Sequence, residues 1–146
     1  MPDIFGDLRN WGQILKQIEL LRLAGQLDEH EEGLTRILRY RYNWQLRQAA
    51  MRAVPELRNP SKDLFDVLLG IVTDEYCDFE TRLLACNAVR DSIRRYHDRR
   101  EPGDLRAQAA ECAGAILGTP QPPVLRKAVE QWLTVKREFV EQAAGA

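Results

Sequence analysis

Apolar residues recur along this chain at intervals of three and four, the spacing that places side chains on one face of an α-helix. Between positions 7 and 24, for example, Trp11, Ile14, Leu15, Ile18 and Leu21 form one such stripe. No segment alternates apolar and polar residues over the length of a strand. The pattern therefore predicts an all-α protein.

Capping residues and helix breakers divide this pattern into seven predicted helices. Asn43, Ser61, Asp78 and Asp104 stand where helix N-caps are expected, because their side-chain oxygens can accept hydrogen bonds from free backbone amides. Pro55 should kink or shorten the last turn of the helix that contains it. The predicted helices span residues 7–24, 29–41, 44–57, 62–73, 79–96, 105–117 and 123–142.

Three of the predicted helices share a motif in which an arginine is followed, three and seven residues later, by a small or apolar residue and then an apolar one. Aligning Arg47, Arg82 and Arg126 brings the three copies into register, with spacings of 35 and 44 residues. A shorter helix rich in Leu, Ile or Ala precedes each copy. This alternation predicts three helical hairpins after one N-terminal helix. An irregular bundle of ordinary helices is the alternative.

The predicted organisation is a single α-helical repeat domain over residues 1–146. An N-terminal capping helix occupies 1–27, and the three hairpins occupy 28–59, 60–100 and 101–143. Because each hairpin contacts only its neighbours in such an array, the second helices should form a continuous face.

The segment "LLGIVTDEYCDFETRLLACNAV" resembles the unit of the HEAT-repeat family, and of bacterial HEAT-like modules in particular. The resemblance implies a right-handed superhelical stack, with Asp74 as the turn aspartate and Arg82 as the second-helix arginine. In that family such residues form a ladder between repeats, which would here comprise Asp74, Arg47, Arg82 and Arg126. The chain departs from the family pattern in the turns before Arg47 and Arg126, which contain no aspartate, and in lacking the proline common in the first helix.

Composition indicates an ordinary soluble globular protein, and the sequence contains no catalytic or cofactor motif. Of its 146 residues, 45% are hydrophobic and 29% charged, and 21 basic residues face 22 acidic ones, so the total charge does not favour nucleic acid or a membrane surface. Three cysteines without a CxxC pair predict neither a disulfide framework nor a zinc site. No phosphate-binding loop or nucleophile motif occurs. We therefore expect no catalytic residue, metal or cofactor, and a cytoplasmic location.

Charged residues are arranged in blocks of alternating sign. Basic residues dominate 36–62 and 82–100, and the intervening segment 63–80 is acidic. The blocks could simply neutralise one another between neighbouring hairpins. Alternatively, Arg47, Arg52, Arg90, Arg94 and Arg95 form a basic strip that meets an acidic partner.

The function that these features favour is non-enzymatic binding of a protein partner through the face of the second helices. Two alternatives stay open: a nucleic-acid-binding protein that uses the basic strip, and an enzyme whose site leaves no sequence motif. We expect no membrane partner, and both a monomer and a homodimer are compatible with the sequence. Leu83 and Met51 should be exposed apolar residues on the binding face. The full set of candidate contact positions is Gln48, Met51, Arg52, Leu83, Cys86, Asn87, Arg90, Arg94, Lys127, Glu130 and Gln131.

Overall fold

The computed structural model describes residues 3–95 and 104–134, and within them the chain is helical without any strand. The prediction of an all-α protein is thus confirmed. Two 3₁₀ turns, Leu27–His30 and Val54–Glu56, accompany the α-helices. The α-helices are α1 (Trp11–Leu23), α2 (Glu31–Arg39), α3 (Trp44–Ala53), α4 (Lys62–Thr73), α5 (Phe79–Arg95), α6 (Asp104–Leu117) and α7 (Pro123–Thr134).

Side-chain N-caps fix where α3, α4 and α5 begin. Asn43 accepts a hydrogen bond from the Leu46 amide at 2.9 Å, and Ser61 accepts one from the Leu64 amide at 3.1 Å. In the same way, Asp78 Oδ2 accepts from the third residue of α5 at 2.9 Å. These three predicted N-caps are confirmed, and each satisfies an amide that has no partner within its own helix.

Three helices are shorter than the apolar periodicity predicted. The first begins at Trp11 rather than at position 7, because the preceding segment runs beside α2 instead of forming a helical turn. The second begins at Glu31 and ends at Arg39, two residues inside its predicted limits at each end. The third ends at Ala53, where Pro55 introduces a 3₁₀ turn, as expected from its missing amide hydrogen. The predicted ends of the helices 79–96 and 123–142 lie outside the described residues.

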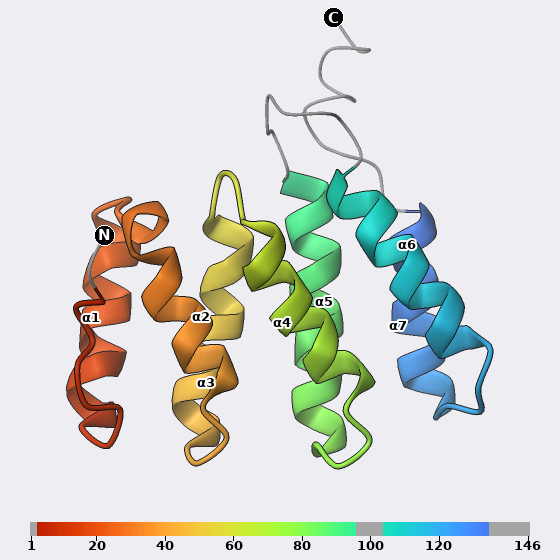
Figure 1. The fold of residues 1–146 in the computed structure, drawn as a ribbon, viewed down its shortest axis with the longest axis horizontal. Coiled ribbons are helices and arrows are strands. Elements are labelled where there is room, and N and C mark those ends of the chain that lie inside the picture. Colours follow the sequence, from red (N-terminus) through yellow and green to blue (C-terminus); the bar gives the residue numbers. More distant parts are fainter. Residues whose placement is uncertain (1–2, 96–103, 135–146) are drawn as a thin grey trace, which may run out of the picture.

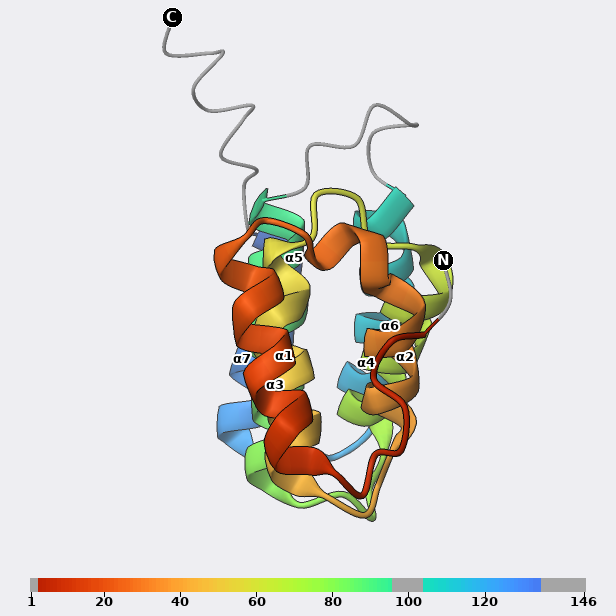
Figure 2. The ribbon, with the colours of Figure 1, turned by 90° about the vertical axis from the view of Figure 1, so that its left-hand side faces the viewer.

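The helices are arranged in two layers. Figure 2 shows α1, α3, α5 and α7 side by side in one layer and α2, α4 and α6 in the other. Within the first layer each helix contacts the next, and all four begin at the lower edge of the molecule in Figure 1. The layer therefore has one edge made of helix N-termini and an opposite edge made of helix C-termini.

The hydrophobic core lies between the layers and continues along the whole array. Each layer contributes fully buried side chains, such as Leu38 and Phe65 from α2 and α4, and Leu46 and Val89 from α3 and α5. At one end of the array, the buried indole of Trp132 on α7 donates a hydrogen bond to the Cys86 carbonyl of α5 at 3.0 Å. No helix among the described residues is long and apolar enough to cross a membrane.

The N-terminal segment is held against α2 by both polar and apolar contacts. Arg36 pairs with Asp3 and donates a hydrogen bond to the Gly6 carbonyl at 2.8 Å. Phe5 is buried on Gly33, where a Cβ atom would lie only 2.5 Å from the phenyl ring. Glycine is thus required at position 33 for the segment to dock.

We predict that Gly33→Ala destabilises the protein by about 1–3 kcal/mol, because displacing Phe5 outweighs the gain of about 1 kcal/mol in helix propensity. Gly70→Ala is the matched control, since a Cβ there meets nothing within 4 Å and the helix is otherwise unchanged. The free energy of unfolding of that control should rise by roughly 0.5–1 kcal/mol. Urea unfolding followed by circular dichroism measures both, and a Gly33→Ala variant as stable as the parent protein would contradict the prediction.

Candidate interaction surface

The three arginines matched in the sequence make the same hydrogen bond in the structure. Each guanidinium donates to a carbonyl in the last turn of the helix that precedes it, where backbone carbonyls have no partner within the helix. The bond joins the two helices of one hairpin. The donor–acceptor pairs are Arg47 Nε to Leu38 at 2.8 Å, Arg82 Nε to Val72 at 2.9 Å and Arg126 Nη1 to Leu117 at 3.3 Å.

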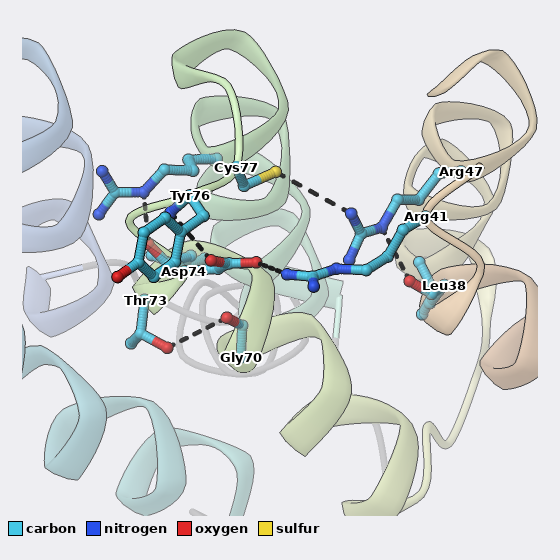
Figure 3. A network of polar contacts seen from close by, with 10 residues as sticks. Leu38, Arg41, Arg47, Gly70, Thr73, Asp74, Tyr76 and Cys77 are labelled. Atoms are coloured by element: carbon cyan, nitrogen blue, oxygen red, sulfur yellow. Dashed lines mark hydrogen bonds and ion pairs between the residues drawn. The ribbon is translucent and has the colours of Figure 1, made fainter. Parts of the chain in front are cut away.

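Two of these arginines also reach the next hairpin. Arg47 Nη1 lies 4.0 Å from the Cys77 sulfur (Figure 3). Arg82 Nη2 lies 3.2 Å from Gln121 Oε1. Cys77 and Gln121 occupy equivalent positions, each five residues before the arginine of its own hairpin. The interactions therefore connect successive hairpins in register.

Asp74 belongs to this network through a different partner from the one that the family resemblance implied. Its carboxylate pairs with Arg41 in the turn between α2 and α3, and not with one of the three matched arginines (Figure 3). Partial burial acts to raise the pKa of Asp74. Hydrogen bonds from the Tyr76 amide and from Arg41, together with nearby positive charge, outweigh burial and hold the pKa of this carboxyl below its ordinary value.

Two of the predicted contact residues are inaccessible. Met51 and Cys86 are both fully buried, so the expectation that they lie on an exposed face is wrong. Each lies on a helix that has a neighbour on either side within its layer, and the neighbours cover flanks that a single apolar stripe would leave open. Burial also raises the pKa of the Cys86 thiol to about 12.

The other predicted positions remain at least partly accessible on the layer formed by α1, α3, α5 and α7. Arg90 is held by Asp91 at 3.0 Å and by Gln131 of α7 at 3.3 Å, so it links α5 to α7. Leu83 is half-buried rather than exposed. Gln48, Asn87, Arg90 and Arg94 are half-buried, whereas Arg52, Lys127, Glu130 and Gln131 are exposed.

Arginines from three helices meet in a surface depression of about 480 Å³ at the C-terminal edge of this layer. Arg22 lies in the last turn of α1, Arg52 in the last turn of α3, and Arg94 and Arg95 in the last described turn of α5. Cations at these places are stabilised by the helix dipoles. We call this feature the arginine depression; its lining is completed by Pro55, Glu56 and Asp91.

The positive charge of the arginine depression is only partly neutralised. Arg22 pairs with Glu19 at 2.5 Å and with Glu56 at 3.6 Å, and Arg94 lies 3.8 Å from Asp91. Among the described residues, the one polar contact of the Arg52 side chain is a long one of 3.5 Å with the Gln48 amide oxygen. Within residues 3–95 and 104–134, neither Arg52 nor Arg95 has a carboxylate partner.

A second depression adjoins the first and shares Arg22, Arg52 and Glu56 with it. It lies between α1 and α3, and apolar side chains contribute much of its surface. These side chains are Leu15, Ile18, Ala49 and Ala53. The combined feature thus offers an apolar floor beside guanidinium groups.

Of the predicted basic strip, Arg52, Arg94 and Arg95 meet in the arginine depression, whereas Arg47 and Arg90 are engaged in contacts between helices. Arg22 was not among the predicted site residues. It belongs to the N-terminal helix, outside the repeated motif, so the alignment of the three hairpins could not point to it. Its place in the last turn of α1 was the available signal.

The three cysteines of the chain are all free thiols. Burial raises the pKa of Cys77 and Cys112 as well as that of Cys86, so all three thiols are protonated near neutral pH. Among residues 3–95 and 104–134, no group of three or more His, Cys, Asp or Glu side chains could hold a metal ion. Comparison with protein-family models, with curated proteins and with solved structures finds no match for this chain.

We predict that Arg82→Ala destabilises the protein by about 2–4 kcal/mol, because the buried guanidinium leaves two hydrogen-bond partners unsatisfied. Arg126→Ala is the matched control, since its side chain is 46% exposed and its bond to Leu117 is longer. For that control we expect the free energy of unfolding to fall by less than about 1 kcal/mol. Urea unfolding measures the difference, and equal losses for the two variants would contradict it.

Stability should also depend on pH through Asp78. Hydrogen bonds from the Thr81 hydroxyl and amide lower the pKa of Asp78 below its ordinary value of 3.8. The folded protein therefore favours the ionised carboxylate, and this stabilisation is present above pH 3.8 and lost as pH falls through the folded-state pKa.

Asp78→Ala should accordingly cost about 1 kcal/mol near neutral pH and distinctly less in acid. Ser61→Ala removes an N-cap that does not titrate, so its cost should stay constant with pH. Chemical unfolding of both variants at several pH values gives the comparison. A cost for Asp78→Ala that does not shrink in acid, relative to Ser61→Ala, would refute this assignment.

Proposed function

We propose that this protein is a non-enzymatic, HEAT-like helical-repeat module that binds an acidic segment of another protein. The observation that carries the proposal is the convergence of arginines from α1, α3 and α5 in one depression, where Arg52 and Arg95 have no carboxylate partner among the described residues. Guanidinium groups bind carboxylates through paired, geometrically specific hydrogen bonds. Dipole stabilisation accounts for an arginine at each helix end but not for unpaired charge gathered at one place.

The apolar depression next to these arginines further restricts the kind of ligand that would fit the site. A ligand that only carried negative charge would leave the half-buried Leu15 and Ala49 without an apolar contact. A protein segment with an apolar side chain flanked by aspartate or glutamate would fill this floor and reach Arg52 as well. Burying apolar surface at the centre, with charged contacts at the rim, is the arrangement common to protein interfaces.

The repeat-like architecture supports the same proposal. Three hairpins tied by equivalent arginines leave the layer of α1, α3, α5 and α7 with an outer face that the other layer does not cover. Helical-repeat proteins use extended faces of this kind for binding. The remaining exposed candidates, Lys127, Glu130 and Gln131 on α7, line neither depression.

Nucleic acid is the second candidate, because clustered arginines are also what phosphate groups bind. Glu56 and Asp91 in the depression, and Glu19 beside it, oppose a polyanion, since each already lies against an arginine. A phosphate backbone would have to compete with these three carboxylates. A short acidic segment could instead address Arg52 and Arg95 alone.

The proposal can be tested with a fluorescein-labelled peptide of about ten residues that carries a central leucine among glutamates, followed by fluorescence polarisation. We expect the double variant Arg52→Glu/Arg95→Glu to weaken binding by at least about tenfold, because it reverses the unpaired charge. Lys127→Glu on α7 is the control for charge reversal elsewhere on the same layer, and circular dichroism should show unchanged helix content in both.

Three outcomes decide between the candidates. Loss of peptide binding in the double variant alone supports the acidic-segment proposal. Equal loss in the Lys127→Glu control would mean that only general charge matters, which contradicts it. Tighter binding of a labelled DNA or RNA, with steep dependence on salt and on Arg52, would favour the nucleic-acid alternative instead.

A further inference from the structure

Large apolar residues stand exposed at the start of every helix in the layer of α1, α3, α5 and α7. Trp11, Trp44 and Phe79 are the first residues of α1, α3 and α5, and they are 40%, 62% and 38% exposed. In α7, Val124 follows the initial proline and is 57% exposed. Because these helices lie side by side and begin at the same edge, the three aromatic residues and Val124 form a row. We call these four residues the aromatic row.

Two tyrosines in the turns that lead into these helices add to the same edge. Tyr42 precedes the N-cap of α3 and is 89% exposed, and Tyr76 lies in the turn before α5 and is 97% exposed. Of the two tyrosines in the turn between α2 and α3, Tyr40 packs against the core and Tyr42 does not. The two rings meet edge to face, with their centroids 5.4 Å apart. Packing between hairpins therefore does not account for Tyr42 or Trp44.

The tryptophans of the row also offer polar groups. Trp132 donates its indole N–H to a backbone carbonyl, whereas Trp11 and Trp44 donate to no residue of the described chain. An indole at a protein surface combines a large apolar ring with a hydrogen-bond donor, and such residues are enriched at binding sites. A ligand that presents apolar side chains and free carbonyl oxygens would satisfy both parts.

We propose that the aromatic row binds a proline-rich, basic segment of a partner protein in the polyproline II conformation. Neighbouring packed helices lie about 8–10 Å apart, and a polyproline II helix repeats every three residues, or about 9.3 Å. A segment crossing the helix starts would thus present one proline ring to each interval along the row. Its carbonyl oxygens make no internal hydrogen bonds and are free to accept from Trp11 and Trp44.

The charges near the row favour a basic segment over a polyanion. Glu75 and Glu80 are exposed beside Tyr76 and Phe79, and neither forms an ion pair with a described residue. Arg9 and Arg41, in the segments that lead into α1 and α3, are already paired with Asp7 and Asp74. Single-stranded nucleic acid also stacks on aromatic rings, but it requires a positively charged groove along its backbone. Lysine or arginine residues flanking the prolines would instead meet the two glutamates.

The probe for this proposal is a fluorescein-labelled peptide of about ten prolines flanked by lysines, long enough to span the row. Fluorescence polarisation should show binding, and Trp44→Ala should weaken it by at least about tenfold. Leu20→Ala is the matched control, because Leu20 is an exposed apolar residue (66%) of α1 that lies outside the row. The emission of buried Trp132 and circular dichroism report whether each variant is folded.

The proposal is supported if the proline peptide binds, Leu20→Ala leaves binding unchanged and Trp44→Ala removes it. It is overturned if no binding occurs at millimolar peptide, or if a lysine-flanked glycine–serine peptide binds equally, since charge alone would then suffice. Preferential binding of oligothymidine, abolished by Trp44→Ala, would overturn it in favour of a nucleic-acid site. The double variant Arg52→Glu/Arg95→Glu should still bind the proline peptide. This result would distinguish the aromatic row from the arginine depression.

Discussion

A hydrogen bond from an arginine near the start of one helix to a carbonyl at the end of the preceding helix joins the two helices of each hairpin. Arg47, Arg82 and Arg126 each satisfy a carbonyl that its own helix leaves unpaired. The bond recurs at equivalent places in the three hairpins. Arg82 is the most buried of the three, at 7% exposed for the residue as a whole, and it also contacts the next hairpin, so the centre of the array depends on it most strongly.

Repeating this geometry makes α3, α5 and α7 parallel, and α1 joins them on the same layer. Parallel helices place all their partial positive charge at one edge and all their partial negative charge at the other. Arginines in the last turns of α1 and α3 suit the C-terminal edge, and the Asn43 and Asp78 caps suit the N-terminal edge. The two candidate binding sites differ in chemistry because they lie at these opposite edges.

Local features of the structure were predictable because they depend on residues close together in sequence. Asn43, Ser61 and Asp78 each accept a hydrogen bond from an amide three residues away. The residue type and its position before an apolar helix were therefore sufficient to predict these N-caps. Burial of Met51 and Cys86 was not predictable from a single apolar stripe, because neighbours within the layer cover the flanks of α3 and α5. The pairing of Asp74 with Arg41 depends on how two turns 33 residues apart face each other. The arginine depression likewise requires three helix ends to meet, which spacing alone does not reveal.

The separation of the two edges has a consequence for how the protein could engage its partners. Both sites use α1, α3 and α5, yet one lies at the beginnings of these helices and the other at their ends. A helix rises 1.5 Å per residue, so the ten residues of α3 place its ends roughly 15 Å apart. An acidic segment at one edge and a basic, proline-rich segment at the other could therefore bind together without contact. If both segments belonged to one partner, the second contact would be intramolecular, and two weak sites would together hold that partner more tightly than either alone.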